Sequence, residues 1–99
     1  MLETFTLATF QPLVGQTFRA VIGDAGITEL TLTDASLTTG DSDSRRKRDP
    51  FRLGFLAPAG SPALQGVASV THDTLGELSI FLVPLSSGPK GVEYEAIFS

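Results

Sequence analysis

The sequence predicts an all-β domain, a small six-stranded antiparallel barrel or sandwich with one short N-terminal helix. Two observations support this prediction. Apolar and polar side chains alternate from Thr17 onward in several segments, which is the period of a β-strand. Residues that favour turns separate these segments, and no internal repeat is visible. Small barrels and sandwiches are the architectures in which such short strands share one core.

The helix is expected before the first strand. Leu7, Phe10 and Leu13 recur at helical spacing, and Gly15 can end the segment in a left-handed conformation. Pro12 removes a backbone donor and limits the helix to a turn or two, in part of 3₁₀ type. We expect Phe10 and Leu13 to plug one open end of the sheet.

The strands are expected over residues 17–22, 27–37, 51–57, 66–72, 76–84 and 91–99. In the second of these, Leu30 and Leu32 should face the core, and the change of pattern at Ala35 and Ser36 predicts a bulge or bend. In the third, Gly54 predicts a bend or a close backbone approach.

The last two strands form the predicted nucleus of the core. Alternation places Phe81, Val83 and Ile97 on the face opposite the core, where a second covering layer or a partner would be needed. If nothing in the fold covers them, they form an apolar patch, and such patches mark interfaces. The final strand is also expected at a sheet edge, which invites pairing with another chain. Both features predict a protein partner, either a second copy or another protein.

Composition bounds the class of protein. The chain has 99 residues, which fits one domain, and its 41% hydrophobic and 18% charged residues fit a soluble globular protein. It has no cysteine, so disulfides, thiolate nucleophiles and cysteine-ligated metals are excluded. The net charge of −4 disfavours non-specific binding of nucleic acid. We expect a cytoplasmic protein with no membrane contact, because neither a secretory signal nor a long apolar run is present.

The segment from Thr38 to Pro50 is expected to be an exposed, flexible loop. It contains the basic cluster Arg45, Arg46, Lys47 and Arg48 and no aliphatic or aromatic side chain. The cluster is a candidate anion-contact loop, with nucleic acid as one possible ligand. The flanking aspartates offset its charge and no aromatic residue is available for base stacking, so nucleic-acid binding is disfavoured.

Catalytic and metal-binding patterns are weak. His72 is the only histidine and stands beside Asp73, which could orient its ring. No nucleophile elbow accompanies it, so a histidine making local hydrogen bonds in a turn is favoured over a hydrolase-like centre. Glu93 and Glu95 share a face but are expected to be solvated. We predict no enzyme activity, no cofactor and no metal. The alternative is a small-ligand pocket at a barrel mouth near His72 and the segment 58–64.

Two segments carry a resemblance to a known family. Residues 2–10 with residues 14–18, and residues 76–84 with residues 94–98, are similar to the opening and close of a bacterial domain of unknown function of about this length. The resemblance brings no catalytic residues. It implies a loose association with small phage-tail-collar-like proteins, and hence a structural or accessory role. The leading expectation is therefore a non-enzymatic structural or protein-interaction domain.

Overall fold

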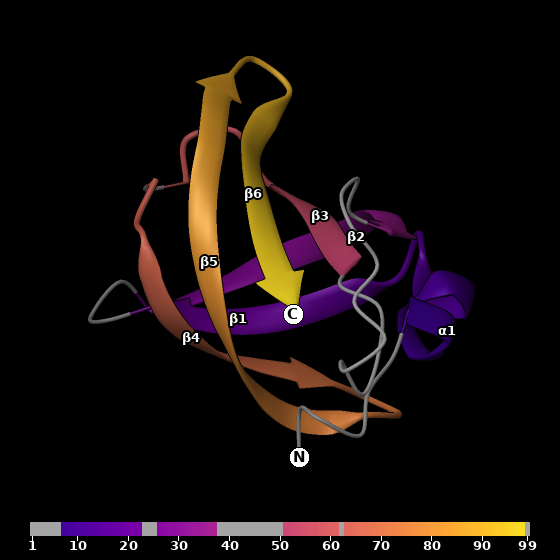
Figure 1. Ribbon diagram of the computed structural model, residues 1–99. Coiled ribbons are helices and arrows are strands. Elements are labelled where there is room, and N and C mark those ends of the chain that lie inside the picture. The colour runs from indigo at the N-terminus through magenta and orange to yellow at the C-terminus, as the bar shows by residue number, and fades with distance from the viewer. Residues whose placement is uncertain (1–6, 23–25, 38–50, 62, 99) are drawn as a thin grey trace.

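The structure, a computed structural model, is a closed antiparallel barrel. It describes residues 7–22, 26–37, 51–61 and 63–98. A helix α1 (Leu7–Phe10) and a 3₁₀ turn η2 (Gln11–Leu13) come first. The strands follow as β1 (Thr17–Ile22), β2 (Ile27–Leu37), β3 (Phe51–Ala57), β4 (Gly66–His72), β5 (Gly76–Gly88) and β6 (Gly91–Phe98). They are ordered β1-β2-β3-β6-β5-β4, with β4 pairing back onto β1 (Figure 1). The predicted fold class is confirmed.

Alternation along the strands fills the barrel with apolar side chains. In β1 and β3, for example, Phe18, Phe55 and their same-face neighbours point inward. The ring of Phe18 meets that of Phe55 edge to face, with 5.5 Å between the ring centroids. Side chains from all six strands are buried in this way, so the interior is a packed core.

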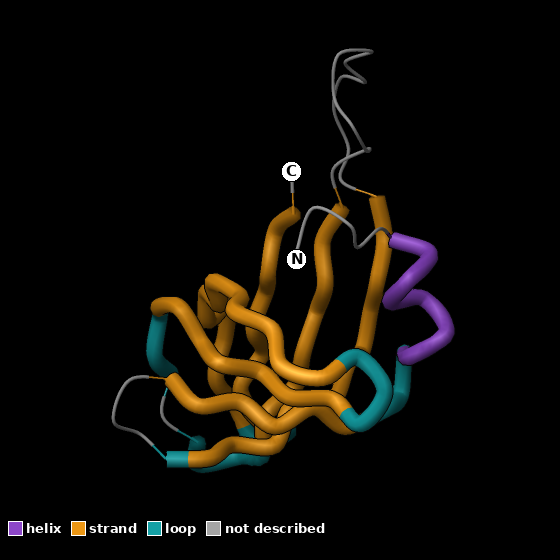
Figure 2. The backbone as a smooth tube through the Cα atoms, turned by 90° about the horizontal axis from the view of Figure 1, so that it is seen from below, coloured by secondary structure: helices purple, strands orange, loops and turns teal. Residues whose placement is uncertain are grey.

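The N-terminal helix packs against one end of the barrel, and Figure 2 shows it lying beside the strands. Phe10 is fully buried against Phe51 at the start of β3 and Phe98 at the end of β6, with ring centroids 5.8 and 5.6 Å away. Leu13 packs partly buried against the same core. Gly15 then reverses the chain with φ of 96°, which glycine adopts at little cost. The predicted plug and its left-handed glycine are confirmed.

Two strands depart from the prediction in detail. The bulge in β2 lies between Leu32 and Asp34, so Thr33 is the extra residue, and not at Ala35 and Ser36 as expected. Thr33 Oγ1 donates to the Gly54 carbonyl oxygen at 3.1 Å, and a Cβ on Gly54 would stand 3.3 Å from that same hydroxyl. The atoms nearest this position belong to side chains, so Gly54 makes room for the hydroxyl of the bulge residue and not for the close backbone approach that the sequence predicted. Strand β5 continues beyond the expected end at residue 84 and runs to Gly88.

The prediction that the last strand forms a sheet edge is wrong. Strand β6 pairs with β3 on one side and β5 on the other. From Val92 to Glu95 the strand is paired on both sides, whereas Ala96, Ile97 and Phe98 pair with β3 alone. Most of β6 therefore offers a partner its side chains and not a free backbone edge.

Candidate protein interface

Apolar side chains gather on the outer surface of three neighbouring strands. Phe81 and Val83 point outward from β5 at successive same-face positions. Val67 of β4 is the direct cross-strand partner of Phe81, and Glu95 of β6 is the partner of Val83. Ile97 follows Glu95 by two residues and shares its outward direction. We call Val67, Phe81, Val83 and Ile97 the β4–β6 face.

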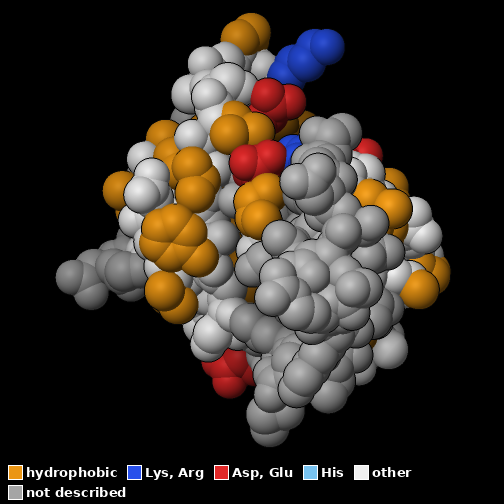
Figure 3. Space-filling model, in the orientation of Figure 1, with side chains coloured by type: hydrophobic (Ala, Val, Ile, Leu, Met, Phe, Trp, Pro, Cys, Tyr) orange, Lys and Arg blue, Asp and Glu red, His pale blue; other side chains and the backbone are white. Residues whose placement is uncertain are grey.

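The β4–β6 face is open to solvent within the described chain. Phe81 is 51% exposed, Ile97 56% and Val67 65%, whereas Val83 is half-buried. Figure 3 shows hydrophobic side chains clustered over β5 and its neighbours. The covering layer considered from the sequence is therefore not supplied by the described residues. An enclosed aromatic side chain buries about 150–250 Å². Because Phe81 is about half exposed, a substantial fraction of its surface remains in contact with water.

Val67 was not singled out from the sequence, although a signal for it exists. In β4 both Val67 and Val70 are apolar, so alternation alone does not tell which of them faces outward. The tight connection between β4 and β5 settles the question, because it pairs His72 with Gly76 and hence Val67 with Phe81. Reading the register back from that turn would have placed Val67 beside Phe81.

Acidic side chains surround the β4–β6 face. The sequences of β4, β5 and β6 contain three glutamates and neither Lys nor Arg. Glu77 accepts a hydrogen bond from the Ser69 hydroxyl, and Glu93 accepts one from the Ser86 hydroxyl at 2.6 Å. These hydroxyl donors fix the carboxylates without neutralising them.

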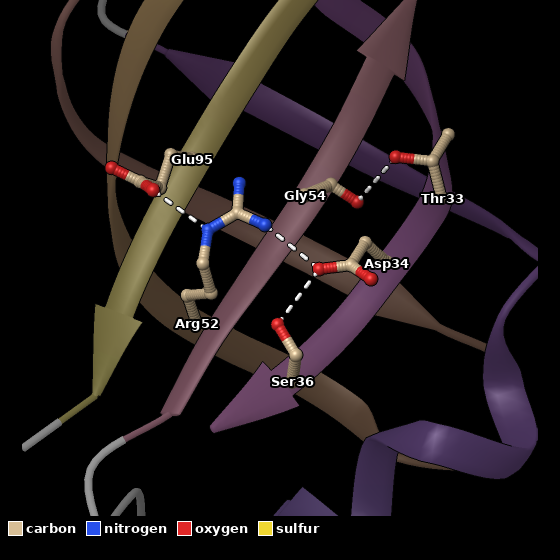
Figure 4. Close-up of polar contacts among 6 residues, drawn as sticks. All are labelled: Thr33, Asp34, Ser36, Arg52, Gly54 and Glu95. Atoms are coloured by element: carbon tan, nitrogen blue, oxygen red, sulfur yellow. Dashed lines mark hydrogen bonds and ion pairs between the residues drawn. The ribbon is translucent and has the colours of Figure 1, made fainter. Parts of the chain in front are cut away.

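The third glutamate belongs to an ion-pair cluster on the outer surface of β2, β3 and β6 (Figure 4). Arg52 donates from Nε to Glu95 Oε2 and from Nη1 to Asp34 Oδ2, each at 2.7 Å. Ser36 adds a hydrogen bond to the same Asp34 oxygen at 2.9 Å. Arg52 also stands directly opposite Ile97 in the ladder, so this cation, the one beside Ile97 among the described residues, is already paired with two carboxylates. Glu95 is therefore not the solvated glutamate that the sequence predicted.

The arginine nearest the other side of the face, on β1, is paired too. Arg19 stands opposite Thr71 of β4 and donates from Nη2 to Asp73 Oδ1 at 3.1 Å. Asp73 is thus engaged with Arg19, and the sequence-based idea that it orients His72 finds no support in the hydrogen bonds. Both arginines that flank the face are occupied by partners of their own.

His72 is a buried structural residue. His72 is only 3% exposed, and the centroid of its ring lies 4.5 Å from the centroid of the Phe18 ring. Nδ1 accepts hydrogen bonds from the backbone N–H groups of Thr74 and Leu75 at 3.0 and 3.3 Å. Nε2 therefore carries the proton and donates to Gln16 Oε1 at 2.7 Å. The favoured interpretation, a histidine making local hydrogen bonds in a turn, agrees with this geometry.

The alternative pocket is not assembled as expected. Strand β4 runs from just after Leu64 to His72, so its length separates the end of the 58–64 segment from the histidine. Leu64 instead donates its backbone N–H to the Tyr94 hydroxyl at 3.2 Å. A depression of about 390 Å³ lies elsewhere, beside the β5–β6 turn, with Leu56, Lys90 and Glu93 in its lining. His72 does not contribute to it.

The remaining predicted sites have no structural counterpart to compare. Arg45, Arg46, Lys47 and Arg48 lie outside the described residues, as does the rest of the 38–50 segment. Within the described ranges, no group of three or more His, Cys, Asp or Glu side chains is placed to hold a metal ion.

Comparison with known protein families gave a match over most of the chain. The profile of a family described as a domain of unknown function, DUF6916, matches residues 5–98. No curated protein and no solved structure matched the chain. Among the described residues, no helix is long and apolar enough to cross a membrane.

Proposed function

Since the chain belongs to the DUF6916 family of unknown function, we propose that it is a non-enzymatic protein-interaction domain whose binding surface is the β4–β6 face. The observation that supports this proposal is the exposure of the cross-strand pair Val67 and Phe81 on β4 and β5, with Ile97 exposed on the outer surface of β6. Exposing large apolar side chains lowers solubility, so a patch of this kind is typical of a surface that another molecule covers.

Barrel closure shapes the proposed mode of binding. Because the strands close into a barrel and β6 is paired on both sides up to Glu95, recognition falls mainly to side chains and not to backbone hydrogen bonds. Phe81 is the central anchor, because it has apolar neighbours on its own strand and on β4. Aromatic anchors at the centre of a contact typically carry much of its binding energy.

The proposed setting follows the resemblance seen in the sequence. We place the domain in the bacterial cytoplasm, as an accessory component of a phage-tail-like assembly. In such a setting a rigid barrel would serve as an adaptor that docks through one face. Nucleic-acid contact through Arg45–Arg48 is a separate prediction, which a salt-titrated oligonucleotide assay tests.

Site-specific photo-crosslinking in the native cell tests the proposed surface. Benzoylphenylalanine is placed at position 81 on β5, and in the control at position 27 on β2, which lies three strands away around the barrel and carries an exposed isoleucine. We expect a discrete protein adduct from position 81 and none from position 27. Adducts from position 27 alone, or from neither position, would contradict the proposal.

A further inference from the structure

The charges around the β4–β6 face indicate the chemistry of its partner. We propose that this partner is a different protein, with an apolar contact surface surrounded by Lys and Arg side chains. This inference rests on the proposed interaction function and adds to it the class of partner. It is carried by the distribution of charge over three strands and not by any single residue.

The first step is that the face has a negative surround. Glu77 and Glu93 lie at exposed positions on β5 and β6 and receive hydrogen bonds only from hydroxyl groups among the contacts described. No lysine or arginine occurs within β4, β5 or β6, and the one nearby lysine, Lys90, stands in the turn between β5 and β6. Their charge is therefore available to a molecule that covers the face.

The second step is that the flanking arginines do not reverse this sign. Arg52 is shared between Asp34 and Glu95, and Arg19 is paired with Asp73. Each flanking cation is matched or outnumbered by its own carboxylates. Lys90, in the turn between β5 and β6, lines the same depression as Glu93 and is the third cation in this neighbourhood. Among the described residues, the five carboxylates Asp34, Asp73, Glu77, Glu93 and Glu95 still outnumber the three cations Arg19, Arg52 and Lys90, which leaves an excess of negative charge.

The third step excludes a second copy as the preferred occupant. Two copies that met through this face would bring their glutamates together at a contact from which water is partly removed. Like charges at such a contact are repulsive, and opposite charges both attract and speed association. Apolar contact with Phe81 and ionic contact with Glu77 and Glu93 are satisfied together by an apolar surface with a basic rim.

Two matched peptides provide the test. Both are soluble amphipathic helices with the same apolar positions, and they differ only in carrying Lys or Glu at the polar positions. Backbone amide shifts of the isotope-labelled full chain locate binding, and titrations at low and high salt give the affinity. We expect the Lys peptide to shift amides of β4, β5 and β6 and to bind about tenfold more tightly than the Glu peptide at low salt. The difference should shrink at high salt, because the Debye length falls from about 30 Å at 0.01 M to about 3 Å at 1 M.

Variants separate the apolar contribution from the ionic one. Glu77→Gln combined with Glu93→Gln should weaken binding of the Lys peptide several-fold, since exposed ion pairs contribute modestly each. Glu29→Gln on β2 is the matched control. It should leave the affinity for the Lys peptide unchanged, because Glu29 is exposed on a strand three positions around the barrel from β5. Phe81→Ser should weaken both peptides.

The outcomes test the basic-partner inference separately from the proposed interaction function. Equal binding of both peptides at the β4–β6 face would overturn the basic-partner inference and leave the interaction surface standing. Absence of shifts on the face with either peptide would also overturn the inference, and the crosslinking result then decides the proposed function separately. Sedimentation showing a dimer with concentration-dependent shifts on β4, β5 and β6 would identify a second copy as the occupant and overturn the inference.

Discussion

Replacing Phe10 by alanine is expected to destabilise the barrel strongly, because this one side chain closes its end. Phe10 has no exposed surface and contacts the rings of Phe51 and Phe98, which themselves stack with 4.7 Å between centroids. Truncating a buried phenylalanine to alanine costs about 3–5 kcal/mol. A domain of this size has a free energy of unfolding of about 5–15 kcal/mol, so the loss is a large share of the total.

The measurement is urea unfolding followed by circular dichroism, with the free energy of unfolding extrapolated to water. Phe81→Ala is the matched control, since it removes the same atoms from a side chain that is 51% exposed. We expect Phe81→Ala to cost about 0.5–1 kcal/mol, the scale of a cross-strand pair on a sheet surface. In thermal unfolding, Phe10→Ala should lower the midpoint by roughly 12 °C or more, from about 4–8 °C per kcal/mol for domains near this size.

Equal losses of unfolding free energy for Phe10→Ala and Phe81→Ala would refute the claim that Phe10 closes the end of the barrel. If Phe10→Ala cost less than about 1 kcal/mol, the helix would be an appendage and the barrel would close without it. A loss for Phe81→Ala as large as that expected for Phe10→Ala would mean that Phe81 is enclosed in solution, which would also remove it from the proposed binding surface.

Three further substitutions test the construction of the barrel. Gly91→Ala should cost several kcal/mol in urea unfolding, because its φ is 137° and an added Cβ would stand 2.1 Å from the Ala57 carbonyl oxygen; Gly88→Ala, where no atom lies within 4 Å, should change little, and equal effects would reject the close approach. His72→Ala should cost about 1–3 kcal/mol by leaving two backbone N–H groups of the next turn without their acceptor; a neutral result would show that water replaces the ring. Arg52→Met should cost about 1 kcal/mol at low salt and less at high salt, as expected of partly exposed ion pairs; a salt-independent loss would show that packing dominates.

Much of the fold could be predicted because strand alternation is a local property. The inward positions of β3, such as Leu53 and Phe55, follow directly from period-two burial between turn signals. Closure is not local, since the pairing of β4 with β1 joins residues that are far apart in the sequence. For this reason the prediction left barrel and sandwich open and mistook β6 for an edge.

The details that were missed arise from register. The bulge at Thr33 depends on which residue of β3 lies opposite, and Gly54 supplies the space that an alternating pattern within β2 cannot report. The candidate face was predicted in part, because Phe81 and Ile97 are large apolar residues at positions that alternate with core residues. Val67 and the pairing of Glu95 with Arg52 required knowledge of the neighbouring strand.

Hydrogen exchange on the complex with the crosslinked partner tests the central claim most directly. If the β4–β6 face is the binding surface, side-chain packing of the partner should slow amide exchange in β4, β5 and β6 and leave β2, on the far side of the barrel, unchanged. Protection confined to β2 and its neighbours, or none in β5, would contradict the account.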